Sequence, residues 1–227
     1  MSFLHIIKSR FFRATSFSPF LMRVLLGFLI LALLSYLFVD FPLIELISPL
    51  RSKLRLLMKG TSLLIFPPFH LVLWTGAFLF ARFLSAEKKW TLPFFEIALS
   101  QYLSVAFVRI FKVVIGRARP ESFLSKNVTG FDFFSGDHYF HSLPSGHTMA
   151  AFTLAASIAL LFPRFRVISL IIAFHFSMAR IYLLDHFPSD IFATAVIGIF
   201  IAQMVHTLIN KIAYRYDRRE LYEETFT

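Results

Sequence analysis

Three short polar segments interrupt an otherwise apolar chain, and together they contain residue types suited to binding and attacking a phosphate group. They run from Lys112 to Pro120 (KVVIGRARP), from Pro144 to His147 (PSGH) and from Arg180 to Asp190 (RIYLLDHFPSD). Arginine presents a planar fork that matches phosphate oxygens, and lysine adds a point charge. Imidazole gains or loses a proton near neutral pH. The combination indicates an anion site equipped with acid–base groups.

The first segment supplies the cations. Lys112 and Arg119 are seven residues apart, so on a continuous helix they share a face two turns apart, and Pro120 is expected to end that helix. Charged groups at membrane depth are costly and usually functional. The alternative is that Lys112, Arg117 and Arg119 only extend to the membrane surface, which is the commoner behaviour for such a cluster on its own. Arg109 lies deeper, and we expect it to pair with Glu96 in a structural role.

The second segment predicts a helix start. Proline and serine are favoured there, and the free N–H groups of a first turn bind anions. Gly146 permits a close approach of backbone to ligand. His147 follows directly, so its ring can lie beside an anion held by Ser145 and Gly146. The alternative is an ordinary helix cap followed by a histidine at the membrane surface.

The third segment pairs a histidine with an aspartate. Pro188 to Asp190 reads as the first turn of a helix. Asp190 is four residues after His186, close enough to accept its ring N–H, which would fix the tautomer and leave the other ring nitrogen free to attack phosphorus. A simple capping contact is the alternative. Asp185 adjoins His186, but we expect it to point elsewhere and do not select it.

The remaining histidines are assigned less specific roles. His70, His175 and His206 lie inside apolar runs and are expected to be packed and hydrogen-bonded. His138 and His141 fall in a polar loop that could line a substrate entrance. A metal site needs three or four converging ligands, and the nearby cations would repel a metal ion. We therefore expect neither a metal nor another cofactor.

The composition determines what kind of fold must position these segments. The chain has 227 residues, of which 57% are hydrophobic and 16% charged, with 31 phenylalanines and a mean hydropathy of +0.71. These values argue against a soluble globular enzyme and against a disordered chain. There is no cysteine, which excludes disulfides and thiolate metal sites. We expect an all-α, polytopic membrane protein.

Six apolar runs predict six transmembrane helices. A cleavable signal peptide is not expected, because the first run is too long for one and no small-residue cleavage site follows it. No internal repeat is visible. The runs are residues 21–39, 61–84, 92–115, 147–162, 167–184 and 191–209.

Charge distribution predicts the orientation. With six spans, 12 lysines and arginines fall on the side that holds both termini and 8 on the other, so both termini are expected in the cytoplasm. The net charge of +10 comes from dispersed residues rather than one polar face, which argues against nucleic acid and for anionic lipid headgroups as partners. All three polar segments then lie on the outer side.

The expected organisation is a single membrane domain with short flanking segments. Residues 40–59, with Ile47, Leu50, Leu54 and Leu57 at helical spacing among basic residues, predict an amphipathic helix on the outer surface. The predicted parts are a cytoplasmic interfacial segment (1–19), a six-helix domain (20–210) containing that helix and a periplasmic loop (116–146), and a cytoplasmic tail (211–227).

The three motifs, in this order and spacing, resemble those of the type 2 phosphatidic acid phosphatase superfamily. The matching residues are Lys112, Arg119 and Pro120, then Pro144 to His147, then Arg180, His186 and Asp190. The third motif of that family usually opens Ser-Arg, and Ala179 replaces the serine here. The resemblance implies a six-helix membrane bundle and a metal-independent lipid phosphate phosphatase.

The resemblance also implies roles for the residues. Lys112, Arg119, Arg180, Ser145 and Gly146 would bind phosphate, His186 would attack it, Asp190 would orient His186, and His147 would protonate the leaving oxygen and activate water.

The chemical class of the substrate follows only in outline. The resemblance implies a bacterial inner-membrane enzyme of phospholipid metabolism, acting on undecaprenyl diphosphate, phosphatidylglycerol phosphate or lipid A phosphates. A lipid-to-lipid phosphotransferase is the nearest alternative. A transporter or a non-catalytic lipid-binding protein is a more distant one. The sequence does not indicate an oligomeric state.

Overall fold

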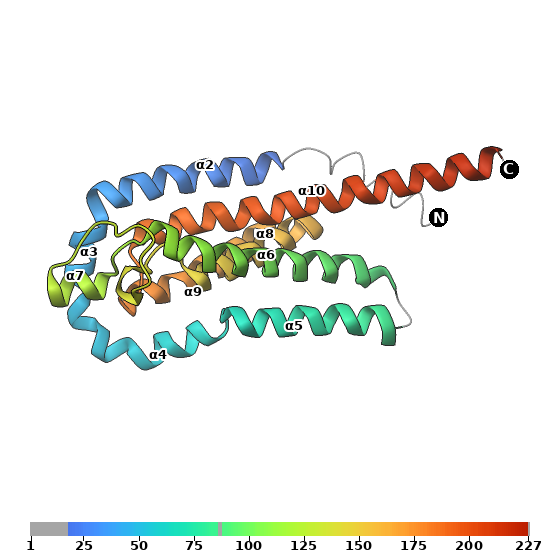
Figure 1. Cartoon of the computed structure of the whole chain (residues 1–227). Helices are drawn as coiled ribbons and strands as arrows, with labels where there is room; N and C mark the ends of the chain where they lie inside the picture. Colours follow the sequence, from blue (N-terminus) through green and yellow to red (C-terminus); the bar gives the residue numbers. More distant parts are fainter. Residues whose placement is uncertain (1–17, 86–87, 227) are drawn as a thin grey trace.

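Helices make up almost the whole protein. The computed structural model describes residues 18–85 and 88–226, and within these the only strand-like feature is an isolated bridge between Arg117 and Phe131. The predicted all-helical class is therefore confirmed. The α-helices, as Figure 1 labels them, are α2 (Pro19–Leu34), α3 (Asp40–Ile47), α4 (Arg51–Leu63), α5 (Pro67–Leu79), α6 (Thr91–Ile115), α7 (Pro120–Lys126), α8 (Gly146–Leu161), α9 (Arg166–Tyr182) and α10 (Pro188–Phe226).

Five helical segments are long and apolar enough to cross a membrane. They are Pro19–Lys53, Arg55–Leu84, Thr91–Ile115, Pro163–Tyr182 and Pro188–Ala213. Helix α8 is also apolar but has only 16 residues, so the count of six spans stays a prediction. Large apolar side chains cover the outside of the bundle. Phe38, Val72 and Leu84 are each at least 70% exposed, which suits contact with lipid tails and not with water.

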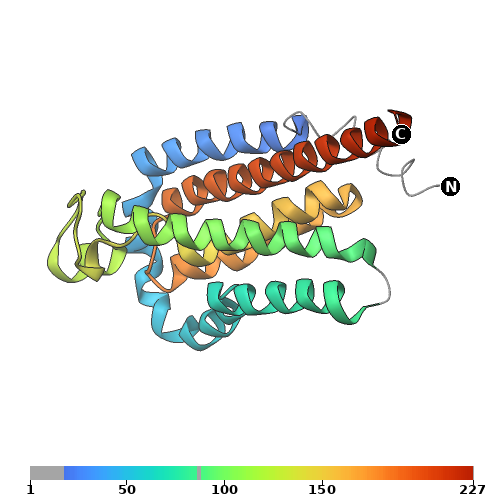
Figure 2. The same ribbon diagram turned by 45° about the vertical axis from the view of Figure 1, so that its right-hand side comes forward.

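The long helices lie side by side in one bundle. Helix α10 packs against α8, α2 and α6, while α9 packs against α8 and α5 packs against α6 (Figures 1 and 2). The short helices α3, α4 and α7 gather at one end, on the left in Figure 1. The C-terminus of α10 extends beyond the opposite end.

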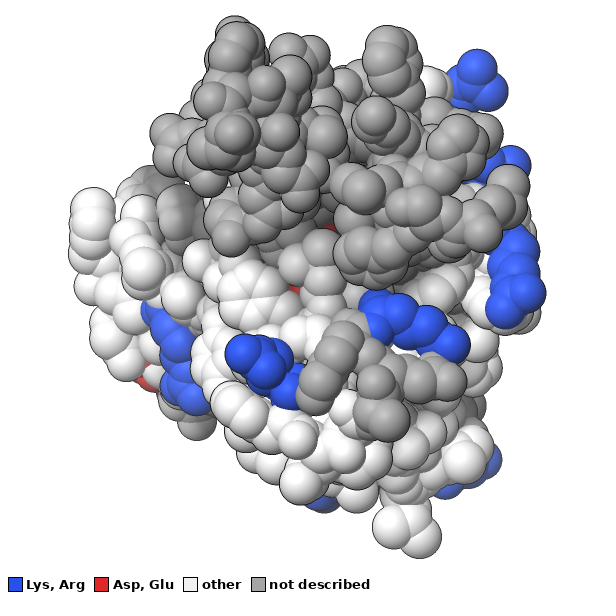
Figure 3. Space-filling model, turned by 90° about the vertical axis from the view of Figure 1, so that its right-hand side faces the viewer, with Lys and Arg blue, Asp and Glu red and all other residues white. Residues whose placement is uncertain are grey.

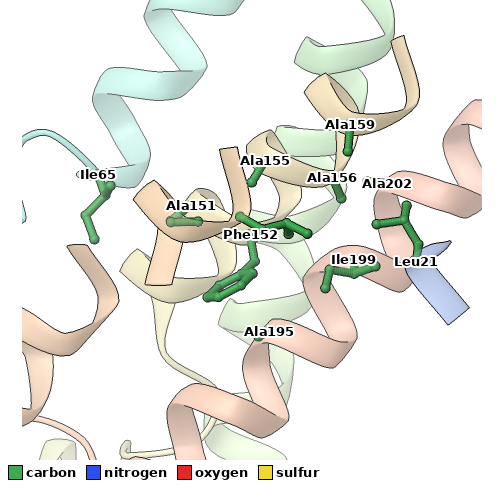
Figure 4. Packing of buried hydrophobic residues seen from close by; sticks show 12 residues of the cluster. Leu21, Ile65, Ala151, Phe152, Ala155, Ala156, Ala159, Ala195, Ile199 and Ala202 are labelled. Carbon is green, nitrogen blue, oxygen red and sulfur yellow. The ribbon is translucent and has the colours of Figure 1, made fainter. Parts of the chain in front are cut away.

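Small residues allow the central helices to approach closely. Around Phe152 and Ile199, the core of α8 and α10 consists largely of alanines (Figure 4). A Cβ atom placed on Gly198 of α10 would lie 3.0 Å from Oγ1 of Thr153 and 3.2 Å from the carbonyl oxygen of Met149 in α8. Close packing of this kind drives helix association where lipid tails remove the hydrophobic advantage.

Buried hydrogen bonds also join α6 to α8. The hydroxyl oxygens of Ser104 and Thr153 are 2.7 Å apart, and the Gln101 amide donates to the carbonyl oxygen of Ala150 at 3.1 Å. All three polar side chains are buried. These contacts fix the register of the two helices that carry Lys112 and His147.

The predicted amphipathic helix over residues 40–59 is wrong as a single element. Helix α3 ends at Ile47, a 3-10 turn spans Ser48–Leu50, and α4 begins at Arg51. Pro49 lies in that turn, where its missing N–H and fixed φ favour a break between helices. Helix α4 then runs to Leu63, and α5 begins only at Pro67.

The structure also contradicts a continuous helix from Lys112 to Arg119. Helix α6 ends at Ile115, and the next residue, Gly116, has a left-handed φ of 55°. A Cβ at this position would meet the carbonyl oxygen of Asp132, so only glycine fits. Arg119 instead precedes α7 in extended conformation.

Several basic side chains are visible among the described residues at the end of the bundle opposite the short helices (Figure 3). Exposed Arg82 and Lys89 follow α5, exposed Arg164 lies between α8 and α9, and exposed Arg166 begins α9. The segment 1–19 that we expected to lie on the membrane falls almost entirely outside the described residues. Helix α10 continues to Phe226, so the residues predicted as a cytoplasmic tail (211–227) are helical as far as the structure describes them.

Candidate active site

The end of the bundle that holds α3, α4 and α7 brings the three polar segments together. Lys112 comes from the last turn of α6, Arg119 from the start of α7, and Arg180 from the last turn of α9. All three cations act electrostatically on the ring of His186, which lies between α9 and α10. Separate parts of the sequence therefore surround one histidine with positive charge.

Each cation is held in place by neighbouring groups. The Lys112 ammonium donates to the carbonyl oxygen of His141 at 3.1 Å, and Nε of Arg119 donates to that of His138 at 3.0 Å. The Arg180 guanidinium donates to the Ser62 hydroxyl at 2.9 Å. Nε of Arg180 is buried without a hydrogen-bond partner, so it could still donate to an anion.

Asp185 bridges the two arginines, which the sequence analysis did not foresee. Its Oδ1 lies 3.3 Å from Arg119, and its Oδ2 lies 2.6 Å from Arg180. We expected this side chain to point elsewhere on a regular backbone. The backbone here is not regular, because Leu184 has a left-handed φ of 60°. That turn is what redirects Asp185 toward the arginines.

The PSGH segment forms the predicted helix start. Ser145 caps α8, with its hydroxyl 3.5 Å from the N–H of Thr148. The N–H groups of Gly146 and His147 lie in the first turn, where no preceding helical carbonyl can accept them. The N–H of Ser145 is not available, because it donates to Thr194 at 3.0 Å. A Cβ at Gly146 would make only ordinary contacts, so the protein's own packing does not require glycine there.

His186 is oriented by a backbone carbonyl instead of by Asp190. Its Nδ1 lies 2.5 Å from the carbonyl oxygen of Ser142. A carbonyl can only accept, so Nδ1 carries the proton and Nε2 keeps its lone pair. The predicted direct hydrogen bond from His186 to Asp190 is therefore wrong. The predicted consequence still holds, because one ring nitrogen carries a held proton and the other is free.

Asp190 supports this arrangement from behind. Its Oδ2 accepts from the Ser142 hydroxyl at 2.6 Å and from the N–H of Phe187 at 2.8 Å. Asp190 thus holds Ser142, whose carbonyl contacts the ring of His186, and Phe187, the residue that follows His186 in the chain. Its Oδ1 pairs with Arg117.

Arg117 and Asp40 are buried partners that the sequence analysis missed. We had considered Arg117 with the cations that might only extend to the surface, but its side chain is 6% exposed and that of Asp40 is fully buried. Arg117 donates to Asp40 at 2.6 Å and also pairs with Asp190. Asp40 in turn accepts from the N–H and hydroxyl of Ser189. A carboxylate at the end of an apolar run was the available signal for Asp40.

Burial and charge keep His186 neutral. The residue is 2% exposed, and burial, followed by the charges of Lys112, Arg119 and Arg180, lowers the pKa of His186 well below its ordinary value. A neutral imidazole with a fixed Nδ1–H has its Nε2 lone pair free at physiological pH. Such a group can act as a nucleophile toward phosphorus.

His147 is more open than His186. It is partly exposed, and its ring centroid lies 6.0 Å from that of Phe66. It is close enough to Lys112 and Arg180 to feel their charges. His147 is therefore placed among the same cations, on the more accessible side.

Two other histidines have structural partners. Nε2 of His70 lies 2.9 Å from the carbonyl oxygen of Leu64. Nδ1 of His206 lies 2.8 Å from Glu96, so the pair that we expected between Glu96 and Arg109 is wrong. Across residues 18–85 and 88–226, no three His, Asp or Glu side chains are grouped so that they could hold a metal ion.

Known proteins resemble this chain in both sequence and fold. Residues 93–214 match the family described as the PAP2 superfamily. A lipid A 1-phosphatase from Rhizobium johnstonii is 35% identical over 127 residues, which cover 56% of this chain and 45% of that protein. A lipid A 1-phosphatase from Rhizobium etli is 40% identical over 89 residues, covering 39% and 38%. The match thus spans less than half the length of either relative.

A solved structure has a similar fold. The first transmembrane PAP2 type phosphatidylglycerolphosphate phosphatase from Bacillus subtilis superposes with a TM-score of 0.50 at 23% identity. The superposition covers 84% of this chain and 96% of the other. At this level of identity the likeness concerns the helical membrane fold alone.

Proposed function

Because the chain belongs to the PAP2 superfamily, we propose that it is an integral membrane phosphatase that removes phosphate from a phosphorylated lipid. One observation carries the proposal. A neutral histidine with a fixed Nδ1–H is surrounded by Lys112, Arg119 and Arg180, three cations contributed by three separate segments. This arrangement suits a nucleophile placed where a phosphate anion binds.

The proposed reaction proceeds through a phosphohistidine. Nε2 of His186 forms a bond to phosphorus as the bond from phosphorus to the lipid oxygen breaks, and His147 gives that oxygen a proton. Water then attacks the phosphohistidine while His147 takes a proton from it, and the P–N bond breaks to release phosphate. Lys112, Arg119, Arg180 and the free N–H groups of Gly146 and His147 in the first turn of α8 stabilise the charge on the equatorial oxygens.

Asp190 has a supporting role in this mechanism. It holds the Ser142 hydroxyl and the N–H of Phe187, and the Ser142 carbonyl in turn holds His186. If the His186 ring were free to rotate, it would have to be ordered again in each turnover, and the rate advantage of a fixed nucleophile would be partly lost. We propose that Asp190 acts on catalysis through this contact.

The proposed reaction does not need a metal ion. A metal ion in phosphoryl transfer usually neutralises the charge on the transferring group. Here Lys112, Arg119 and Arg180 can supply that positive charge from the protein itself. Activity of the purified enzyme is expected to persist in excess EDTA, and vanadate is expected to inhibit by filling the phosphate site.

We propose that the site faces the periplasm of a bacterial inner membrane, with both termini in the cytoplasm. The opposite end of the bundle carries exposed Arg82, Lys89, Arg164 and Arg166, as cytoplasmic loops commonly do. Substrate headgroups would then be hydrolysed at the outer surface.

The substrate we favour is a lipid A phosphate, because both curated relatives are named lipid A 1-phosphatases. Undecaprenyl diphosphate and phosphatidylglycerol phosphate are the competing substrates within the same reaction class. A lipid-to-lipid phosphotransferase would use the same residues and differ only in the acceptor.

The test is a lipid panel assayed with the purified full chain in detergent. Phosphate release is measured from lipid A, undecaprenyl diphosphate and phosphatidylglycerol phosphate, with a second lipid present or absent as acceptor. His186→Gln should abolish release, and Arg51→Gln, at a partly exposed ion pair with Glu121, should not. Release that depends on added divalent ions, or that survives in His186→Gln, would contradict the proposal. No release from any lipid in any condition would favour a non-catalytic lipid-binding protein.

A further inference from the structure

Asp185 occupies the side of the site where a phosphate group would bind. Its two carboxylate oxygens contact Arg119 and Arg180, one on each guanidinium. Carboxylate and phosphate oxygens use the same guanidinium N–H donors. Among the described residues, no carboxylate other than that of Asp185 forms a direct ion pair with Arg119 or Arg180. A phosphate bound between them must therefore displace or share this carboxylate.

The exposure of Asp185 indicates that it can be displaced. Its side chain is 24% exposed, whereas that of Asp190 is fully buried and held by Arg117, Ser142 and the backbone. A partly exposed carboxylate regains hydration when it turns outward, and a phosphate that takes its place keeps the arginines paired, so the exchange costs less than it would for a buried carboxylate. A buried carboxylate has no such alternative.

The positive charge of the site explains how a displaceable carboxylate would affect turnover. Lys112, Arg119 and Arg180 lie within reach of one another's charges. Cations in a poorly hydrated site bind a phosphate dianion strongly, and the product of the reaction is itself such a dianion. Binding that is equally strong for substrate and product slows turnover once the site is saturated. A carboxylate that competes for the same donors weakens product binding.

We propose that Asp185 is a turnover-determining residue whose carboxylate competes with phosphate for Arg119 and Arg180 and so promotes release of the product. In the free protein it keeps the two guanidinium groups together despite their mutual repulsion. During the reaction it turns outward to admit the phosphate group, and it returns as inorganic phosphate leaves. This inference rests on the proposed function, because it assumes that these arginines bind phosphate.

The test measures binding of inorganic oxyanions, which needs no lipid substrate. Vanadate and inorganic phosphate are titrated into the purified full-length protein in detergent by calorimetry. Asp185→Asn keeps the shape of the side chain and removes its charge. We expect it to bind both ions roughly ten- to a hundredfold more tightly than the natural protein, from the loss of one negative charge next to the ligand.

Matched variants separate this effect from general charge and from folding. Asp132→Asn removes the same charge from an exposed position in the loop at the same end, and its affinity should stay unchanged. Asp185→Ala should also bind more tightly, which provides a second measurement if the asparagine variant does not fold. Both Asp185 variants should show stronger inhibition by phosphate and a lower kcat, with a lower KM.

The outcomes are distinguishable. Unchanged or weaker oxyanion binding in the Asp185 variants, with normal binding in the natural protein, would show that Asp185 merely orients the arginines and would overturn this inference alone. If the natural protein binds neither vanadate nor phosphate, the proposed phosphate site is itself wrong, and the inference fails with it.

Discussion

The carbonyl oxygen of Ser142 lies 2.5 Å from Nδ1 of His186, while the hydroxyl of the same serine donates to Asp190 at 2.6 Å. One residue therefore connects the carboxylate to the imidazole, with its backbone toward the ring and its side chain toward the acid. This relationship gives the Ser142 side chain a role that it would not have if Asp190 contacted His186 directly.

Replacement of Ser142 by alanine should have a moderate effect. The carbonyl that holds His186 remains, and one hydrogen bond to a charged group is lost, so we expect kcat to fall about tenfold with little change in KM. Asp190→Asn should cost more, because it also disturbs Arg117 and the N–H of Phe187. Steady-state kinetics with p-nitrophenyl phosphate measures both. Ser125→Ala, which removes an exposed hydroxyl, is the control. Unchanged activity in Ser142→Ala beside a large loss in Asp190→Asn would argue instead for a direct action of Asp190 on His186.

The two histidines should differ in their dependence on the leaving group. A lipid alkoxide needs a proton to leave and a nitrophenolate needs it little, and general acid–base catalysis contributes about 10²–10⁴ in rate. His147→Ala should therefore lose most activity on a lipid phosphate but retain more phosphoenzyme formation from p-nitrophenyl phosphate. The trapped phosphohistidine should persist, because His147 also activates water. His186→Ala should form no phosphoenzyme from either substrate. Rapid-quench experiments on both variants test this, and similar losses of His147→Ala on both substrates would show that the roles are wrong.

The pH profile should report the lowered pKa of His186. Burial and the nearby cations favour the neutral ring, so the nucleophile stays unprotonated below its ordinary pKa of about 6.5. The rate of phosphoenzyme formation from p-nitrophenyl phosphate should then not decline on the acid side until the pH is well below that value. Arg119→Gln removes one of the cations, raises the pKa of His186 and should move the decline toward higher pH. A decline that stays in place in this variant would contradict the electrostatic explanation.

Loss of Arg117 should destabilise the protein strongly. Arg117→Gln leaves the carboxylates of Asp40 and Asp190 buried without their cation, and breaking a buried ion pair in this way costs about 3–5 kcal/mol. Unfolding of the purified protein in detergent measures the change in free energy. Arg51→Gln removes a partly exposed pair with Glu121 and should cost less than about 1 kcal/mol. A small effect at Arg117 would mean that the buried carboxylates find other partners or become protonated.

The orientation can be tested with single cysteines, since the natural chain has none. Gly136 is exposed in the loop at the active-site end, and a side chain there would meet nothing within 4 Å. The neighbouring Ser135 is buried and would label poorly. In intact cells, an impermeant maleimide should label Gly136→Cys and should label Arg164→Cys, at the other end, only after lysis. The reverse pattern would place the site in the cytoplasm.

The sequence predicted well those features that depend on local pattern. The apolar runs indicated the helices, and the run over residues 147–162 agrees with α8 to within one residue. The three polar segments were correctly expected at one end. The predictions that failed concern backbone geometry. The spacing favours a helix from Lys112 to Arg119, but Gly116 adopts a left-handed conformation that ends the helix. The loop carbonyl of Asp132 lies so close to Gly116 that no other residue fits there.

Contacts between distant residues could not be predicted from spacing. The sequence around Asp185 predicts a regular backbone, on which this side chain points away from the arginines. In the structure Leu184 adopts a left-handed conformation, and a leucine does not indicate such a turn as a glycine or asparagine would. The partner of His186 is the backbone carbonyl of Ser142, and because every residue has a carbonyl, the residue type does not indicate this contact. Asp40 meets Ser189, 149 residues later, and a single sequence contains no information on such a pairing.

The pairing of Asp40 with Ser189 has a consequence for how the protein is made. Synthesis proceeds from the N-terminus, so Asp40 enters the membrane region long before its partners exist. Arg117 can neutralise it when α6 is complete, but Ser189 and Asp190 arrive only with the last helix. His186, the proposed nucleophile, is added just before them. A partly synthesised chain that lacks α10 therefore lacks two of the partners of Asp40 and Arg117, and the proposed site is completed in the same step as the buried charge network.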